Sequence, residues 1–201
     1  MTDEIAEKPE RSIHEIVRKE IAHAGWARLL VATVRLPDGR LIKHEIEDHG
    51  EAACVLPYNP LRRTAVLVRQ FRVPVLFAAQ AEETLEAIAG IVEKNEAAAR
   101  CAQREAREEA HLQLEAVQHI FTAWTMPGLS TERMHFYLAV YAEEAQTDIG
   151  GGLADENENT LAVEIGLAEL ARMADANELT DVKTLLLVQT LRLRRPELFG
   201  S

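Results

Sequence analysis

The sequence predicts a domain of the α/β class with one compact core. Its 201 residues are 47% hydrophobic and 27% charged, a composition typical of chains that bury a core. Strand patterns lie on both sides of one strong helix signal in the middle of the chain, and two more helix patterns follow near the C-terminus. This order of elements indicates a fold that mixes strands and helices.

The N-terminal part is predicted to contain a helix and then a hairpin. Ser12 is a suitable cap for a helix over residues 12–23, because apolar residues recur there at helical spacing. Residues 27–36 and 41–47 have strand patterns on either side of Pro37-Asp38-Gly39. Asp-Gly supplies the left-handed conformations that a tight turn needs, so these two segments are expected to pair.

The rest of the chain alternates between strand and helix patterns. Residues 52–57 and 64–71 predict a second hairpin, and a third strand leads through 85–88 to Gly90. Residues 97–110 predict a helix, because they are nearly all Ala, Arg, Gln and Glu, with no Gly or Pro. Further strands are expected at 115–122, 134–140 and 161–165, and helices at 167–174 and 181–194. The Gly150-Gly151-Gly152 run is expected to divide strands.

Charge and composition exclude several classes of protein. The chain has 33 acidic and 22 basic residues, so its net charge is −11, which disfavours nucleic acid as a partner. The longest apolar stretches are far shorter than a membrane span, and the acidic N-terminus does not resemble a secretory signal. Two cysteines are too few for a disulfide framework. We therefore expect a cytoplasmic protein with no membrane partner.

Three glutamates lie on one face of the central helix. Glu108 and Glu109 follow Glu105 by three and four residues, so helical geometry gathers the three carboxylates in one patch. A hard cation such as Mg²⁺ or Mn²⁺ relieves the repulsion between them, since it prefers carboxylate oxygens. The alternative is a solvated helix face with ion pairs such as Arg104 with Glu108.

The spacing around this helix resembles the Nudix box. Five residues separate Gly90 from Glu96, seven separate Glu96 from Arg104, and the sequence continues as Arg-Glu-apolar-x-Glu-Glu. One position departs, because His111 stands where the box has its second glycine. A non-glycine residue in the left-handed conformation costs roughly 1 kcal/mol, and histidine tolerates it better than most. We expect this departure to affect local stability more than metal binding.

The resemblance implies a hydrolase in which water attacks phosphorus with the help of Mg²⁺ or Mn²⁺. Nudix hydrolases cleave a nucleoside diphosphate linked to a second group. The implied metal ligands are three helix carboxylates and one backbone carbonyl: Glu105, Glu108, Glu109 and Ala89. Glu105 and Glu109 are the ones expected to matter most for catalysis. Glu96 and Arg104 resemble the ion pair that fixes the helix against the loop after Gly90.

Other segments are similar to the ADP-ribose and GDP-mannose pyrophosphatases of this family. They are residues 69–72, 85–90, 126–132, 150–158 and 180–193. Residues 69–73 and the three glycines look nearer to the GDP-mannose enzymes, whereas 153–158 look nearer to the ADP-ribose enzymes. The resemblance therefore implies a pocket that accepts more than one nucleotide sugar.

Four residues outside the box receive roles from this second resemblance. Arg72 is expected to grip a substrate phosphate, and Glu132 to lie beside the substrate pocket. Glu156 is expected to be the general base and Glu158 an additional metal ligand, although these two roles could be exchanged. Each role has a plain alternative: a surface ion pair for Arg72, a surface carboxylate for Glu132, and a solvated acidic loop for the last two.

The resemblance also implies an architecture and an assembly. It implies an α/β/α sandwich around a mixed sheet, with a helical lead-in at 1–26, a small N-terminal β subdomain at 27–50 and the Nudix domain at 51–201. The β subdomain is expected to form a homodimer. Two rival functions remain: a Nudix hydrolase of nucleoside triphosphates or capped RNA, and a Nudix module that binds a ligand without catalysis.

Overall fold

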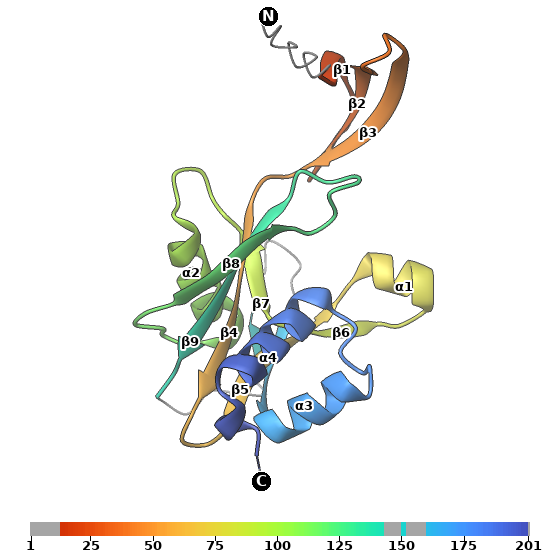
Figure 1. Cartoon of the computed structure of the whole chain (residues 1–201). Helices are drawn as coiled ribbons and strands as arrows, with labels where there is room; N and C mark the ends of the chain where they lie inside the picture. Colours follow the sequence, from red (N-terminus) through yellow and green to blue (C-terminus); the bar gives the residue numbers. More distant parts are fainter. Residues whose placement is uncertain (1–12, 143–149, 152–159, 201) are drawn as a thin grey trace, which may run out of the picture. The chain divides into compact units, whose positions relative to one another are not determined.

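The computed structural model describes residues 13–142, 150–151 and 160–200, which fall into two compact units (Figure 1). The first unit contains the described residues up to His49 together with Thr125–Glu132, and the second contains the others. The division after His49 lies one residue from the boundary expected from the sequence. The sequence did not reveal that Thr125–Glu132 belongs with the N-terminal unit. Glu156 and Glu158 lie outside the described residues.

The first unit is a three-stranded antiparallel sheet. Its strands are β1 (Glu15–Ala24), β2 (Arg28–Arg35) and β3 (Leu41–Asp48), in the order β1-β2-β3. The predicted hairpin between β2 and β3 is confirmed. Gly39 has a φ of +85° in its turn, a conformation that glycine adopts without a steric penalty.

The helix expected over residues 12–23 is wrong, because β1 occupies most of this segment. Its pairing with β2 runs from Glu15 opposite Arg35 to Ala24 opposite Arg28. Register shifts after Ile16 and after Ile21 interrupt the two-residue alternation by which a strand is recognised. These irregularities leave the apolar residues at spacings that imitate a helix.

A histidine joins β3 to the Thr125–Glu132 segment within the first unit. The imidazole of His49 hydrogen-bonds to Glu47 and, through Nε2 at 2.9 Å, to Oε2 of Glu132. Its ring stacks on Trp26 with 4.9 Å between centroids. Burial opposes the charged form of His49, but the hydrogen bonds to Glu132 and Glu47 outweigh it and raise the pKa of this histidine.

This pKa shift gives the first unit a pH-dependent stability. The protonated form of His49 stabilises the fold. This stabilisation is fully present below pH 6.5, the pKa in the unfolded chain, and is lost as the pH rises through the higher pKa of the folded state. A hydrogen bond to a charged group contributes about 1.5–3 kcal/mol, so His49→Gln should lower the melting temperature at pH 6. The difference from wild type should shrink by pH 9. Thermal melts across this range test it, and a gap that does not change with pH would contradict it.

The second unit is built on a larger mixed sheet with the order β10-β11-β5-β4-β9-β8. Its strands are β4 (Ala52–Asn59), β5 (Thr64–Phe71), β8 (Gln118–Trp124), β9 (Arg133–Val140), β10 (Gly150–Gly151) and β11 (Thr160–Gly166). β6 (Glu83–Glu86) pairs with β5, and β7 (Ile88–Ile91) pairs with β4. β4 and β9 are parallel, and the other pairings described are antiparallel. Gly150 and Gly151 form β10, which pairs with β11, although the sequence predicted that the glycine run would separate strands.

Helices cover both faces of this sheet, which confirms the expected α/β/α sandwich (Figure 1). Alternate residues of β4 point to opposite sides: Ala53 and Val55 pack with α2 (Ala98–Ala110) in one apolar cluster. Cys54 and Leu56 pack with α3 (Leu167–Asp175) and α4 (Val182–Arg194) in the other. A 3₁₀ turn, Pro196–Leu198, follows α4.

One helix was not predicted from the sequence. Helix α1 (Val73–Ala79) has a proline in its first turn and ends at Gln80 in the left-handed conformation. All seven of its residues are apolar and none is buried, so the segment shows no polar-apolar periodicity that would signal a helix. Arg72 is the N-cap of α1 and directly follows the last residue of β5, so the start of α1 sets the backbone position of this arginine. No helix of the described residues is long and apolar enough to cross a membrane.

Candidate metal and catalytic site

Helix α2 holds two of its glutamates in the protein interior. Its small residues, including Ala102 and Ala106, pack against the sheet, so the helix backbone lies close to β4 and β7. Glu105 and Glu109 are one turn apart on the flank of this face, and only 8% and 2% of their surfaces are exposed. Two buried carboxylates are costly in a low-dielectric environment, and a bound cation offsets that cost.

Gly90 in β7 lies directly against one of these carboxylates. A Cβ atom at Gly90 would be 1.7 Å from Oε1 and 2.1 Å from Cδ of Glu105. Such distances are far inside van der Waals contact, so any side chain here would displace Glu105. The glycine that begins the box is therefore required by the position of Glu105.

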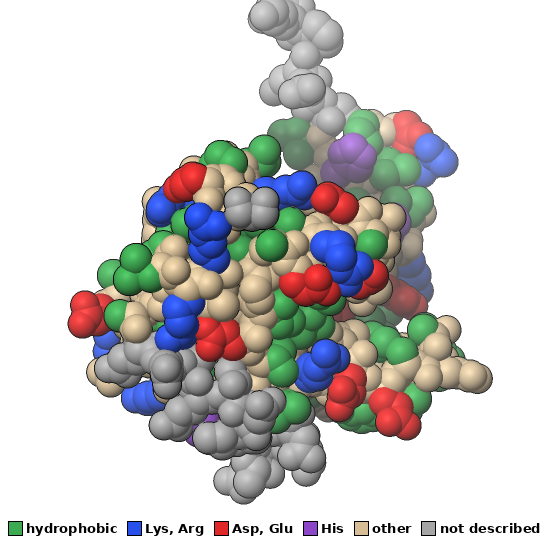
Figure 2. Space-filling view, turned by 90° about the horizontal axis from the view of Figure 1, so that it is seen from below, with side chains coloured by type: hydrophobic (Ala, Val, Ile, Leu, Met, Phe, Trp, Pro, Cys, Tyr) green, Lys and Arg blue, Asp and Glu red, His purple; other side chains and the backbone are tan. Residues whose placement is uncertain are grey.

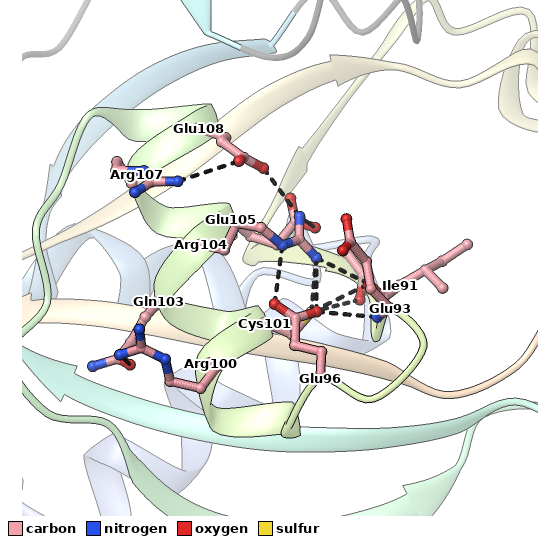
Figure 3. A network of polar contacts seen from close by, with 11 residues as sticks. Ile91, Glu93, Glu96, Arg100, Cys101, Gln103, Arg104, Glu105, Arg107 and Glu108 are labelled. Atoms are coloured by element: carbon pink, nitrogen blue, oxygen red, sulfur yellow. Dashed lines mark hydrogen bonds and ion pairs between the residues drawn. The ribbon is translucent and has the colours of Figure 1, made fainter.

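Arg104 ties the helix to the loop that precedes it (Figure 3). Its guanidinium contacts both carboxylate oxygens of Glu96 at 3.1 Å, and the expected ion pair is present. The same group donates to Oε1 of Glu105 at 2.6 Å and to Oε2 of Glu108 at 3.0 Å. The hydrogen bond from Arg104 lowers the pKa of Glu96, and these carboxylates together raise the pKa of Arg104. One cation thus organises three acidic side chains.

The residue that replaces the second box glycine ends α2 as a glycine would. His111 has φ 53° and ψ 26°, the left-handed conformation expected for it. Its N–H donates to the carbonyl of Arg107, and the N–H of Leu112 donates to the carbonyl of Ala106. This pair of bonds closes the C-terminus of the helix in a Schellman arrangement.

Restoring glycine at this position should stabilise the fold. His111→Gly removes the strain of a left-handed side chain, worth about 1 kcal/mol, while the greater freedom of glycine in the unfolded chain offsets part of the gain. We expect the free energy of unfolding to rise by several tenths of a kcal/mol and turnover to stay within about twofold. Urea denaturation with parallel assays tests both, and a destabilised variant would show that the histidine side chain has a role of its own.

Comparison with known proteins decides the family. The model of the NUDIX domain matches residues 48–186, which include the whole pattern from Gly90 to Leu112. The chain belongs to the Nudix family. It is 33% identical to the GDP-mannose pyrophosphatase of Escherichia coli O1:K1 / APEC over 159 residues, which is 78% of this chain and 82% of that relative.

A second relative and a solved structure are also similar to this Nudix protein. The GDP-mannose pyrophosphatase of Escherichia coli O9:H4 (strain HS) is 34% identical over 158 residues, covering 77% of this chain and 81% of that enzyme. The fold is similar to a crystal structure of an ADP compounds hydrolase, with a TM-score of 0.73 and 17% identity. That match covers 92% of this chain and 95% of the other, and it supports the fold.

The donor set of the Nudix box suits a hard divalent cation. Within residues 13–142, 150–151 and 160–200, no three acidic, cysteine or histidine side chains form a cage ready for a metal. Mg²⁺ does not need one, because it keeps several waters and binds through one or two carboxylates plus substrate phosphates. Glu105 and Glu109 match that requirement, and the half-buried Glu108 lies on the next turn beside Arg104. Hydrolases of this family generally need a divalent metal.

The two predicted substrate contacts lie in ion pairs. Arg72 forms a two-point pair with Glu86, with Nε to Oε1 at 2.9 Å and Nη2 to Oε2 at 2.8 Å. Glu132 accepts from His49 in the N-terminal unit, and its side chain is 16% exposed. Their roles in substrate binding stay predictions, as do those of Ala89, Glu156 and Glu158.

Sequence reasoning missed the buried pair Glu86 and Lys183. Glu86 is a lone charge in the apolar run Leu85–Ile88, and Lys183 lies in the first turn of α4, two residues after its N-cap Asp181. A single charge in a buried strand needs a partner, and that signal could have marked Glu86. The identity of the partner depends on the tertiary fold, since 97 residues separate the two.

Proposed function

We propose that this Nudix protein hydrolyses the pyrophosphate bond of nucleoside diphosphate sugars, with GDP-mannose and ADP-ribose as substrates. The products are a nucleoside monophosphate and a sugar phosphate. The observation that carries the proposal is the pair of buried carboxylates on α2, Glu109 and the Glu105 that lies against Gly90, which suits the metal that a diphosphate substrate requires. The names of the relatives that match over three quarters of the chain support the class of substrate.

The box residues take the following roles in the proposal. Mg²⁺ or Mn²⁺, when bound, polarises the phosphoryl group and activates water. Its ligands are the helix carboxylates and one carbonyl: Glu105, Glu108, Glu109 and Ala89. Arg104 and Glu96 keep α2 in register with the loop, so that the carboxylates stay in place as charge develops on the substrate.

Residues outside the box complete the reaction. Arg72 binds a phosphate oxygen, and Glu132 lies beside the bound substrate. Glu156 takes the proton from the attacking water as general base, and Glu158 adds a metal ligand. With these roles, Glu156→Gln should lower kcat with little change in KM, whereas Glu158→Gln should raise the metal requirement. The opposite pair of phenotypes would exchange the two roles.

The assembly proposed is a cytoplasmic homodimer formed through the N-terminal sheet. Support comes from β1, where Ile16 and Ile21 are 53% and 60% exposed although both are large and apolar. Nucleic acid is not a proposed partner, because the net charge is −11. On the face shown in Figure 2, acidic and basic side chains are interspersed rather than gathered by sign.

A substrate panel tests the proposed activity. We expect hydrolysis of GDP-mannose and ADP-ribose with Mg²⁺ or Mn²⁺, and only weak activity on dNTPs. UDP-glucose is included in the panel as a third nucleotide sugar. Chromatography of the products identifies the bond cleaved. Dominant release of inorganic pyrophosphate from dNTPs, or cleavage of capped RNA, would replace the nucleotide-sugar assignment. Metal-independent binding without turnover would indicate a ligand-binding module instead.

A further inference from the structure

A buried carboxylate at the end of β6 is shared by two cations. Glu86 is 4% exposed, and it accepts from Arg72 at two points and from Nζ of Lys183 at 2.5 Å. Thr84 also donates to it. Burial alone would raise the pKa of Glu86, but the two cations outweigh burial and lower it to about 2. The carboxylate is therefore charged at any pH at which the enzyme would work.

The second cation comes from the start of α4. Nζ of Lys183 also contacts Oδ1 of Asp181, the N-cap of that helix, at 2.9 Å. Asp181 accepts from the backbone N–H of Thr184, and the N–H of Ala87 donates to the Thr184 hydroxyl. These bonds fix α4 to the chain between β6 and β7. The position of Lys183 is thus set by backbone as well as side-chain contacts.

The two cations differ in exposure. The side chain of Arg72 is 38% exposed, whereas those of Lys183 and Glu86 are 12% and 5% exposed. Arg72, Lys183 and Glu86 together carry one net positive charge, and Arg72 is the member at the surface. Asp181 also pairs with Lys183, so the four side chains together are neutral, and the N-terminus of α4 offsets part of the charge of Asp181.

This arrangement has a consequence for any anion that approaches Arg72. If Arg72 alone balanced Glu86, the anion would meet a neutral, tightly held ion pair. With Lys183 sharing the carboxylate, the same group is more positive by one unit charge, so an anion beside Arg72 is held better. Glu86 lies only four residues before Gly90, and an extended chain of that length spans at most about 14 Å. The arginine is therefore anchored near the box.

We propose that Lys183 is a positioning residue for substrate binding: by sharing Glu86, it lets Arg72 attract and hold a phosphate of the substrate. The inference rests on the proposed function, because it takes the ligand of Arg72 to be a diphosphate. Lys183 does not touch the substrate itself. It acts through Glu86, so its loss should weaken ground-state binding and leave the chemical step intact.

The test compares the kinetics of charge variants on GDP-mannose. Lys183→Met should raise KM about tenfold and leave kcat within about twofold, because one charge beside a phosphate site is removed from a low-dielectric environment. Lys183→Arg should restore most of the affinity. Arg194→Met removes a positive charge from the exposed end of the same helix and should leave KM unchanged. Should Lys183→Met fail to fold, Lys183→Gln removes the same charge and keeps a donor.

A double variant separates the electrostatic role from a structural one. Adding Glu86→Gln to Lys183→Met returns the cluster to its wild-type net charge, so KM should fall back toward wild type. If Lys183 only braced the fold, removing a second buried partner would make the defect worse. A KM of the single variant equal to wild type, or a double variant worse than the single, would overturn the inference.

The outcome can be separated from that of the proposed function. If the wild-type enzyme hydrolyses no nucleotide sugar, the substrate assignment falls, and calorimetric binding of inorganic pyrophosphate at fixed Mg²⁺ takes the place of KM. Wild type should then bind pyrophosphate about tenfold more tightly than Lys183→Met. Equal affinities would overturn the inference about Lys183.

Discussion

Glu105→Gln and Glu109→Gln should each lower metal-dependent turnover by at least about 100-fold, the usual loss when one preorganised electrostatic group is removed. Each change keeps the shape of the side chain and removes only its charge. A neutral amide cannot hold a divalent cation against the charge of the substrate. The fold should survive, because both side chains are buried and a neutral amide is easier to bury than a carboxylate.

The measurement is initial rate on GDP-mannose over a titration of Mg²⁺, together with a thermal melt of each variant. Glu115→Gln is the matched control, since Glu115 is exposed and lies beyond the end of α2. It should keep wild-type kinetics. Wild-type rates in both box variants at saturating metal would show that the box does not form the metal site.

The fold was predictable from the sequence where local preference and tertiary packing agree. Residues 98–110 form a helix because an alanine-rich segment with no glycine or proline also presents small residues to the sheet. At β1 the local pattern and the tertiary structure disagree. All residues of this strand are exposed, so its structure is determined by pairing with β2 and not by burial. Isoleucine and valine favour strands, and the register shifts conceal the pattern.

The candidate site was predictable to the extent that it lies on one continuous segment. The box residues from Gly90 to Glu109 occupy a strand, a loop and a helix in succession, so their spacing encodes their geometry. The cluster of Arg72, Glu86 and Lys183 joins the N-cap of α1 to β6 and α4, segments that only the complete fold brings together. Residue spacing predicts contacts only within one element or between neighbouring ones, so the sequence alone could not show which charges surround Arg72.

Gly90→Ala should have an effect nearly as large as loss of a metal ligand, although it changes no charge. The added methyl group would lie 1.7 Å from Oε1 of Glu105, so the carboxylate must move away from its place beside β7. We expect turnover to fall about 100-fold and stability to fall by about 1–3 kcal/mol, as for other overpacked sites. Gly166→Ala is the matched control, because apart from its chain neighbours no atom of the described residues lies within 4 Å of a Cβ at that position.

A second substitution distinguishes this steric cause from a backbone effect. The φ of Gly90 lies outside the left-handed region, so alanine at that position brings no conformational strain of its own. Glu105→Ala removes the atoms that the methyl group would strike. The double variant should therefore be more stable than Gly90→Ala alone, measured by urea denaturation, yet remain inactive because the metal ligand is gone. Recovery of activity in the double variant would show that Glu105 is not a ligand, and failure to recover stability would place the strain in the backbone of β7.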